Sequence, residues 1–296
     1  MKKIAFATCN DAPAHAADDY VLSQYLQKKG FEVEYVVWND SVVDWTVFDL
    51  VLIRSTWDYH QHIEAWQNWL HTLEEKQVNV WNPVETIRWN MHKAYLNELQ
   101  EKGVQIVPTV FIEQGSTANL KVILENQGWW KAVVKPAVSL NAFHTWQTDV
   151  ATASQQQAAF EALVVERDVM IQTFMPEIQT VGEWSLMFFG GEFSHAVLKN
   201  NPTGDFRIQE SYGGLSHIMD IPASFISQAA TILQAVDLPH QYVRVDVLER
   251  DGKLYLMELE LIEPSLFLEL GGEEVIERFG ELVIRGLEGV DYKTHS

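Results

Sequence analysis

Three carboxylates near the carboxyl-terminal end of the chain could hold a metal ion. Asp246, Glu258 and Glu260 stand within two apolar runs, rich in Val, Leu and Tyr, whose alternation predicts strands. Because side chains two apart on a strand share a face, Glu258 and Glu260 point the same way. Carboxylates gathered in a half-buried sheet need a compensating cation, and hard oxygen ligands suit Mg²⁺. From spacing alone, a magnesium site and an acidic hairpin with its charges in solvent are equally good interpretations.

A short turn joins the two apolar runs, which predicts a β-hairpin. The turn signal is Glu249-Arg-Asp-Gly252. With residues 250–252 as a three-residue loop and Gly252 in the left-handed conformation, Asp246 lies diagonally opposite Glu258 on one face. This register would gather the three carboxylates.

Length, composition and charge limit the class of protein. The chain has 296 residues, of which 47% are hydrophobic and 21% charged, as in ordinary folded proteins with a sizeable core and room for two domains. The formal net charge of −20 disfavours nucleic acids and anionic membranes as partners. An anionic nucleotide could still bind where a few Lys and Arg side chains and Mg²⁺ reverse the local sign.

The single cysteine and the apolar runs bear on the compartment. Cys9 follows a run of four apolar residues and is expected to be a small buried residue rather than a nucleophile. That run is too short for the core of a signal peptide, and no stretch has the length of a membrane helix. We therefore expect a cytoplasmic protein.

Strands and helices alternate in the first part of the chain. The strand candidates are residues 3–7, 31–38 and 49–53, and the helix candidates are residues 18–28 and 63–76. Short links between them predict a parallel sheet covered by helices on both faces. Ligand-binding groups in such sheets collect beyond the carboxyl ends of the strands, where Cys9-Asn10-Asp11 and residues 54–59 stand.

The rest of the chain has no repeats, low-complexity tracts or long linkers. Its helix candidates are residues 90–101, 224–236 and 273–286, and its strand candidates are residues 105–111, 132–135, 171–175, 184–189 and 193–199. A turn is expected at Gly190-Gly191, and the tail after Gly289 is expected to be loose.

Several segments fall in an order that resembles the ATP-grasp ligases, in their glutathione-synthetase-like branch. These segments are residues 49–59, 81–83, 133–139, 181–185, 204–209, 213–214 and 256–265. Each motif is weak singly, whereas their order and spacing are specific and cover nearly the whole chain. Within the branch, the sequence is most similar to a bacterial group that includes the cycloserine-forming O-ureido-D-serine cyclo-ligase.

The resemblance implies the ATP-grasp fold, an α/β fold. In it, an N-terminal parallel α/β domain, the pre-ATP-grasp domain, precedes two α+β lobes that sandwich the nucleotide. The corresponding ranges are residues 1–85 for the substrate-side domain, 86–170 for the small central lobe and 171–296 for the C-terminal lobe with the metal site.

The resemblance also implies roles for residues that match the family's motifs. They are Lys93, Lys135, Ser139, Gln172, Phe174, Met175 and Glu183 for the nucleotide, Asp246, Glu258 and Glu260 for magnesium, and Lys199 and Arg207 for catalysis. In the family the two lysines meet the phosphates, residues 172–175 adjoin adenine and Glu183 contacts ribose. Many relatives have Asn where Glu260 stands. From the local sequence pattern alone, Lys93 would be interpreted as a solvated position on a helix, and residues 172–175 would be interpreted as a core strand.

One loop departs from the family pattern. Residues 137–142 read Ala-Val-Ser-Leu-Asn-Ala, without the glycine that many ATP-grasp proteins use to approach the phosphates. Asn141 tolerates positive φ better than most residues, so it could replace that glycine. The phosphate contacts of this loop, including that of Ser139, are left open.

The substrate is expected at the ends of the N-terminal strands. Arg54 could grip a substrate carboxylate with two hydrogen bonds. Ser55, Trp57 and Asp58 would shape the pocket, and Asp58 could receive a substrate amine. Asp18 and Asp19 could do likewise, but acids near a helix start are commonly capping groups.

A second part of the substrate site comes from the family pattern. Gln209, Gly213 and Gly214 would complete a loop that closes on the reaction intermediate, and the glycines allow backbone conformations closed to other residues. The ten histidines form no metal-binding pair and are expected at the surface.

The resemblance implies an ATP-dependent ligase that joins a carboxylate to an amine, or to a thiol, through an acyl phosphate and releases ADP and phosphate. The cofactors would be ATP and Mg²⁺, which Mn²⁺ could replace, and the substrate would be small and amino-acid-like. The family implies a homodimer. The alternatives are an ATP-grasp kinase that leaves the phosphoryl group on its product, and a regulatory protein that binds ATP without turnover.

Overall fold

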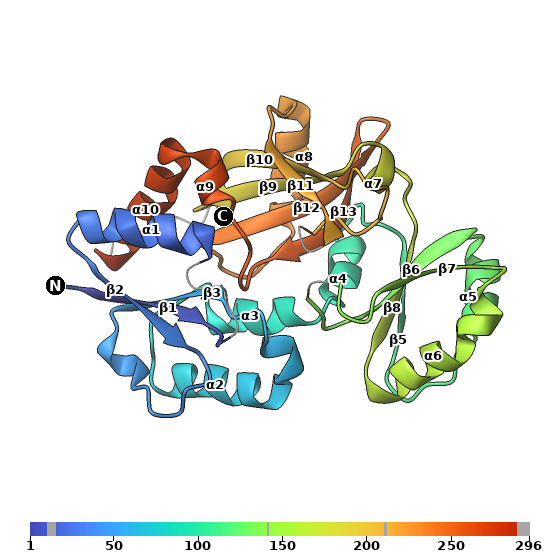
Figure 1. The fold of residues 1–296 in the computed structure, drawn as a ribbon, viewed down its shortest axis with the longest axis horizontal. Coiled ribbons are helices and arrows are strands. Elements are labelled where there is room, and N and C mark those ends of the chain that lie inside the picture. The colour runs from blue at the N-terminus through green and yellow to red at the C-terminus, as the bar shows by residue number, and fades with distance from the viewer. Residues whose placement is uncertain (11–15, 141, 210–211, 289–296) are drawn as a thin grey trace.

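The computed structural model describes residues 1–10, 16–140, 142–209 and 212–288. Asp11, Asn141 and the tail after Gly289 therefore lie outside the described residues. Three sheets follow one another along the chain and are covered by helices, which confirms the α/β class (Figure 1). In the described part, no helix has the length and apolarity needed to cross a membrane.

The first sheet is parallel, with the order β2-β1-β3-β4. Its strands are β1 (Lys3–Thr8), β2 (Glu32–Val37), β3 (Leu50–Ser55) and β4 (Val80–Trp81). Side chains alternate between its two faces: Ile4 and Phe6 contact α1 (Ala17–Lys28) and α10 (Glu273–Leu287), while Ala5 and Ala7 contact α2 (Ile63–Glu75) and α3 (Val84–Met91). The prediction of a parallel sheet covered on both faces is confirmed.

The second sheet is antiparallel and has its helices on one face only. Its order is β5-β8-β6-β7, with β5 (Thr109–Ile112), β6 (Lys131–Pro136), β7 (Trp146–Asp149) and β8 (Val169–Thr173). Helices α5 (Leu120–Gln127) and α6 (Ala153–Glu166) pack against one face. Val133, Lys135 and Gln172 on the other face line a cavity. This lobe stands at the right of Figure 1.

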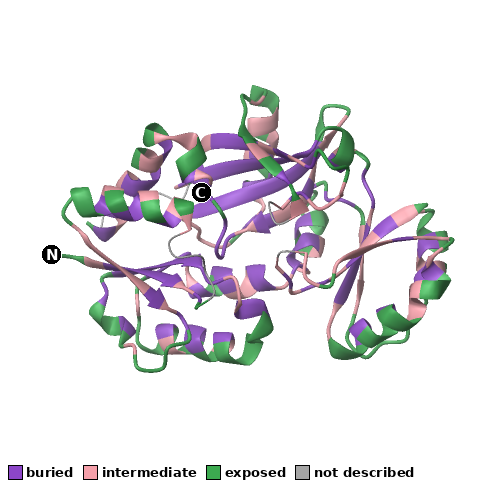
Figure 2. Cartoon of the chain, in the orientation of Figure 1, coloured by how far each residue is buried: buried purple, intermediate pink, exposed green. Residues whose placement is uncertain are grey.

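The third sheet is also antiparallel, and its central strands are the most buried part of the chain (Figure 2). Its order is β11-β10-β9-β12-β13, with β9 (Glu183–Phe189), β10 (Glu192–Asn200), β11 (Leu215–Ile218), β12 (Tyr242–Arg250) and β13 (Lys253–Glu260). Helices α4 (Tyr95–Glu101) and α8 (Ala223–Gln234) cover one face. The other face contacts α10 and the N-terminal sheet and lines the cavity.

Four short helices complete the described elements. They are η1 (Trp45–Val47), η2 (Tyr59–Gln61), α7 (Glu177–Thr180) and α9 (Leu268–Gly271). Cys9 is buried at the end of β1, as predicted. The histidines do not all lie at the surface, because His60 and His195 are buried and His195 contacts the carbonyl oxygen of Leu266 at 2.9 Å.

The helix predicted over residues 90–101 is wrong in its first turn. The chain forms α3 and α4 with a break at residues 92–94, and His92 takes extended angles, φ −104° and ψ 117°. The backbone N–H of Lys93 donates to the carbonyl oxygen of Ala137 at 2.9 Å, so a tertiary hydrogen bond replaces the helical one. The break turns the side chain of Lys93 toward the cavity.

The carboxylate hairpin exists, but its loop has two residues rather than three. Asp251 and Gly252 both have positive φ, 53° and 76°, as the tightest hairpin turns require. A β-bulge with Met257 as the extra residue then shifts the register. Asp246 therefore lies directly opposite Glu258 rather than diagonally, and Arg244 lies opposite Glu260.

The predicted strand at residues 105–111 is divided between two partners. Only its last residues belong to β5. Residues 105–107 instead pair with Leu256 of the edge strand β13: Leu256 N–H donates to the carbonyl oxygen of Gln105 at 2.9 Å, and Val107 N–H donates to the carbonyl oxygen of Leu256 at 3.0 Å. This connection ties the central lobe to the carboxylate hairpin.

Candidate active site

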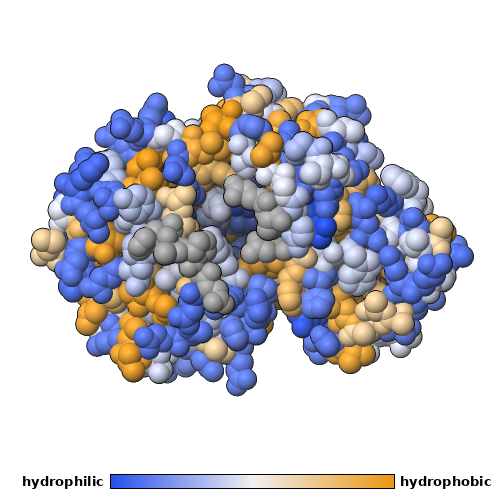
Figure 3. Space-filling view, viewed as in Figure 1, coloured by the Kyte–Doolittle hydropathy of each residue, from blue (hydrophilic) through white to orange (hydrophobic). Residues whose placement is uncertain are grey.

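One cavity of about 1510 Å³ lies where the three sheets meet. The open faces of the second and third sheets form its walls, and residues of the N-terminal sheet and α1 close one end. The molecular surface is hollowed at this place (Figure 3).

The cavity gathers most of the predicted site residues. These are Arg54, Lys93, Lys135, Ser139, Gln172, Phe174, Met175, Glu183, Lys199, Arg207, Gln209, Gly214, Asp246, Glu258 and Glu260. The structure does not bring Ser55, Asp58 and Gly213 to its lining. Ser55 is buried and donates to Thr8 Oγ1 at 2.8 Å, and Asp58 accepts a hydrogen bond from Trp38 Nε1 at 2.6 Å. Both side chains hold the N-terminal domain together.

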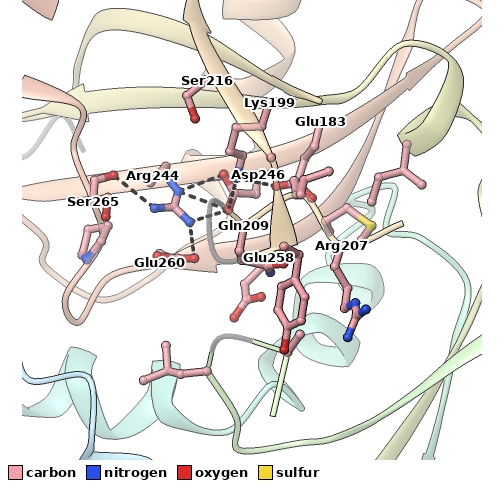
Figure 4. Close-up of a pocket in the computed structure, with 18 of the residues that line it drawn as sticks. Glu183, Lys199, Arg207, Gln209, Ser216, Arg244, Asp246, Glu258, Glu260 and Ser265 are labelled. Atoms are coloured by element: carbon pink, nitrogen blue, oxygen red, sulfur yellow. Dashed lines mark hydrogen bonds and ion pairs between the residues drawn. The ribbon is translucent and has the colours of Figure 1, made fainter. Parts of the chain in front are cut away.

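The carboxylates of the hairpin are paired with protein cations (Figure 4). Arg244 holds Asp246 through Nε and Nη2, at 3.0 and 2.9 Å, and its Nη2 also donates to Glu260. Lys93 Nζ lies 3.0 Å from Glu258 Oε1 and donates to the carbonyl oxygen of Ser139 at 2.8 Å.

Lys199 links the hairpin to the neighbouring strand. Its Nζ lies 2.6 Å from Glu183 Oε1 and 3.3 Å from Asp246 Oδ2. Ser185 also donates to Asp246. Glu183, predicted to contact ribose, is thus an ion-pair partner of the predicted catalytic lysine in this structure.

The same cations do not act equally on all the carboxyl groups. Burial alone would raise the pKa of Asp246, but Arg244 and Lys199 hold this pKa down to about 2. Burial raises the pKa of Glu260 to about 7, because its contact with Arg244 does not offset the loss of water. Burial likewise raises the pKa of Glu183 despite Lys199.

Lys135 differs from the other cations of the cavity. Burial lowers the pKa of its ammonium, and no described residue forms an ion pair or hydrogen bond with it. An uncompensated buried ammonium is costly, so Lys135 lacks an anionic partner that a ligand could supply.

The hairpin carboxylates fit a hard divalent cation in donor type and in facing one cavity. In the described ranges, however, no group of three His, Cys, Asp and Glu side chains is arranged to hold a metal ion. Arg244 and Lys93 occupy oxygens that a metal would need. Asp246, Glu258 and Glu260 could hold Mg²⁺ once these cations give way.

One end of the cavity has an apolar slot. It is lined by Val133, Phe174, Met175, Ile178, Phe206, Ile208, Leu248 and Met257. Lys131 Nζ lies over the ring of Phe174, 4.2 Å from its centre. Gln172 is buried and donates to Thr109 Oγ1 at 3.2 Å. A flat apolar group such as a purine fits a slot of this kind.

The loop after Lys135 adopts a tight conformation without glycine. Ala142 takes a positive φ of 56°, beside Asn141, which lies outside the described residues. Ser139 is buried and donates to the carbonyl oxygen of Pro136 at 3.1 Å. The ring of Phe143 lies 5.1 Å from that of His60, so the loop rests on the N-terminal domain.

The loop over residues 201–214 carries Arg207 and the glycines. Arg207 is paired with Asp205 at 2.7 Å and lies over the ring of Tyr212 at 3.8 Å. Figure 4 shows its guanidinium apart from the cluster around Arg244. A Cβ atom on Gly214 would meet the carbonyl oxygen of Ile208 at 1.8 Å, so this position requires glycine.

Arg54 and Asp19 form a buried pair at the opposite end. Arg54 Nε lies 2.9 Å from Asp19 Oδ1, and Nη2 donates to the carbonyl oxygen of Pro264 at 3.2 Å. Asp19 therefore pairs with Arg54, and α1 has no side-chain cap. Arg54 Nη1 and Asp19 Oδ2 are buried and have no hydrogen-bond partner among the described residues.

Three charged residues that line the cavity were not predicted from the sequence, namely Arg244, Glu263 and Glu269. Arg244 stands two residues before Asp246 on the same strand, so a shared face was a usable signal. Glu263 is a buried carboxylate between Ile262 and Pro264 that also lines the cavity. Its signal was a charge inside an apolar run.

Comparisons with known proteins agree with this geometry. The model of the N-terminal domain of the D-cycloserine synthetase DcsG matches residues 4–82. The cycloserine biosynthesis protein DcsG of Streptomyces lavendulae is 26% identical over 275 residues, which cover 88% of this chain and 90% of that protein. A crystal structure of DcsG superposes with a TM-score of 0.87 at 25% identity, over 96% of this chain and 99% of the other.

A more distant structure shares the fold. The ATP-grasp ligase PsnB, solved with its minimal precursor, Mg and ADP, superposes with a TM-score of 0.63 at 13% identity, over 96% of this chain and 98% of that one. The predicted ATP-grasp fold is thereby confirmed. The chain is a homologue of DcsG and shares the fold of the ATP-grasp ligases.

Proposed function

We propose that the protein joins a carboxylate to an amine through an acyl-phosphate intermediate and releases ADP and phosphate. The observation that carries the proposal is the convergence of Lys93, Lys135 and Lys199, from the break between α3 and α4, from β6 and from β10, on the cavity that the hairpin carboxylates also line. Cations gathered in this way suit a transferred phosphoryl group, because its transfer depends on positioning and charge neutralisation.

The nucleotide would lie between the second and third sheets. Its base would enter the apolar slot around Phe174 and Met175, with Glu183 near the ribose. Its phosphates would extend toward Lys135, which has no described partner, and toward Lys93 beside Ser139. The complex of PsnB with Mg and ADP supports this arrangement by analogy of fold.

The metal would be held by Asp246, Glu258 and Glu260, and Mn²⁺ could replace Mg²⁺. When bound, it would neutralise phosphate charge beside the transferred group. Arg244 and Lys93, which now pair with these carboxylates, would become available to anionic groups of the substrates.

The chemistry would proceed in two steps. A carboxylate oxygen of the substrate attacks the γ-phosphorus of ATP, the bond to the β-phosphate oxygen breaks, and ADP leaves. An amine, or a thiol, then attacks the acyl carbon, loses a proton and expels phosphate. Lys199 and Arg207 would neutralise charge during both steps, and the loop with Gln209, Gly213 and Gly214 would exclude water from the acyl phosphate.

The acid would lie at the end of the cavity formed by Arg54. A small, amino-acid-like acid suits this end, and the name of DcsG points to a related substrate in that protein. We also propose the domain ranges 1–85, 86–170 and 171–296, although β8 crosses the second boundary within one sheet. A homodimer and a cytoplasmic location complete the proposal.

Trapping with hydroxylamine tests the acyl phosphate. Hydroxylamine would convert it into a hydroxamate while ATP is cleaved to ADP, and the Glu258→Gln variant should form neither product. A stable phosphorylated product instead would point to a kinase. AMP and pyrophosphate would point to an acyl-adenylate. Either outcome would contradict the proposed mechanism.

A further inference from the structure

The two ends of the cavity carry opposite charge. The nucleotide end is rich in lysine. The end formed by α1, β3 and the segment after β13 is lined by Asp18, Asp19, Glu263 and Glu269, with Arg54 as its cation. Arg54 is already paired with Asp19 at 2.9 Å, so the remaining charge of this end is negative.

Glu263 is the least compensated of these acids. Its residue is only 5% exposed and lines the cavity, yet no described residue forms a hydrogen bond or ion pair with its carboxylate. Buried carboxylates are normally paired, because desolvation of an unpaired charge is costly. A structural role would require a partner from the protein, and Glu263 has none in the described part of the chain.

The backbone on both sides of Glu263 is held in place. The carbonyl oxygen of Ile262 accepts a hydrogen bond from the Tyr242 hydroxyl at 3.2 Å, and that of Pro264 accepts one from Arg54 at 3.2 Å. The carbonyl oxygen of Ser265 accepts one from Arg244 at 3.1 Å. These bonds fix the segment that presents the carboxylate to the cavity.

Two further polar atoms at this end lack partners. Arg54 Nη1 and Asp19 Oδ2 belong to side chains that are 2% exposed and line the same cavity. This end of the cavity thus offers one hydrogen-bond donor without a described partner, Arg54 Nη1. It also offers two acceptor groups without one, Asp19 Oδ2 and the carboxylate of Glu263. A ligand that fits must donate hydrogen bonds and bring positive charge.

The electrostatics of Glu263 agree with this geometry. Burial raises the pKa of its carboxyl group well above the usual range, and Glu260 adds to the effect. Lys93 acts in the opposite direction but does not offset burial. Lys93 and Arg244 are near enough to act on the group, but neither of these described cations forms an ion pair with it.

We propose that Glu263 binds a cationic nitrogen of the substrate, with Asp19 Oδ2 as a second acceptor and Arg54 Nη1 as a donor to a neighbouring oxygen. The substrate class is therefore an acid with a free ammonium group. N-acylated acids and dicarboxylates do not fit, because they would place a neutral or negative group against unpaired carboxylates. This inference rests on the proposed function of the same cavity.

Binding to paired probes tests the inference without turnover. Calorimetry with the Mg²⁺ complex of a non-hydrolysable ATP analogue would compare both enantiomers of alaninamide with both enantiomers of lactamide. Lactamide is almost the same shape but has a hydroxyl in place of the ammonium. We expect alaninamide to bind at least about tenfold more tightly, as for a hydrogen bond between charged groups. Equal binding, or no binding of alaninamide, would overturn the proposal.

Two variants separate recognition from folding. Glu263→Gln should lose the preference for alaninamide and keep its affinity for the ATP analogue, and its melting temperature should not fall, because no protein partner is lost. Glu277→Gln, an exposed acid on α10 outside the cavity, should keep the preference. A Glu263→Gln variant that melts earlier, or that keeps the preference, would contradict the assignment. Failure of the ATP analogue to bind would instead refute the proposed function.

Discussion

The hairpin end of the cavity and its substrate end balance their charges differently. At the hairpin, Arg244 bridges Asp246 and Glu260, and Lys93 pairs with Glu258. At the substrate end, Arg54 pairs with Asp19 along one edge only, and Glu263 has no partner in the part of the chain that the structure describes. The fold itself therefore pairs the hairpin carboxylates with cations, whereas at the proposed substrate end it leaves Glu263 without a described partner.

This difference separates stability from function. Residues of the hairpin cluster should contribute to both, because breaking a buried ion pair leaves a charge without compensation. Residues of the substrate end should contribute mainly to binding. The following variants test this distinction, in order of decreasing expected effect.

The largest effect is expected for Glu258→Gln. The change removes a carboxylate proposed to hold the metal, and turnover should fall by about 10²–10³-fold or more, as for loss of one charge-stabilising group. The side chain is 27% exposed, so the fold should survive. Steady-state ADP release measures the effect, and circular dichroism checks the fold.

The control for Glu258→Gln is Glu192→Gln, an exposed acid at the start of β10 outside the cavity. It should keep the activity of the wild type. Persisting turnover in Glu258→Gln would refute the metal assignment.

Lys199→Met should lower the free energy of unfolding by roughly 3–5 kcal/mol, because it leaves Glu183 buried without its cation. Lys135→Met provides the matched comparison. Burial lowers the pKa of Lys135 and no described residue pairs with it, so its removal should leave stability unchanged or higher. Urea denaturation without nucleotide measures both, and equal losses would contradict the distinction between paired and unpaired cations.

Arg54→Lys should raise the KM for the acid by about tenfold, because lysine keeps a charge beside Asp19 but loses the planar fork of donors. The KM for ATP should not change. Steady-state kinetics with each substrate varied in turn measures the effect. Equal increases in both KM values would mean that Arg54 acts through the fold rather than on the acid.

The smallest effect on stability is expected for Arg207→Gln. Its pair with Asp205 is screened by solvent, so the free energy of unfolding should change little. Turnover should nevertheless fall if the loop brings Arg207 to the phosphoryl group. A stable variant with undiminished turnover would remove Arg207 from the mechanism.

Elements with strong patterns were predictable from the sequence. The alternation of apolar residues located the hairpin, and strand–helix alternation located the N-terminal sheet. The predicted hairpin loop was one residue too long, although Asp251-Gly252 is a pair typical of the two-residue turn with positive φ at both positions. The bulge at Met257 depends on cross-strand packing and has no local signal.

Features that depend on tertiary contacts were missed. The helix over residues 90–101 breaks because Lys93 bonds to Ala137, which is distant in sequence. The pairing of Arg244 with Glu260 depends on the shifted strand register. Helix α6 was not predicted, although its buried residues Phe160, Leu163 and Val164 stand at helical spacing. The roles proposed for Lys93 and for residues 172–175 came from resemblance, since their local patterns predict a solvated helix position and a core strand.

The most direct test of the proposed ligase is the release of ADP and phosphate from Mg·ATP with a panel of amino acids, O-ureidoserine, dipeptides and amines, with mass spectrometry of the products. We predict ADP and phosphate in equal amounts, together with a product that has lost water or gained an amine. AMP, or a product that retains the phosphoryl group, would contradict the account.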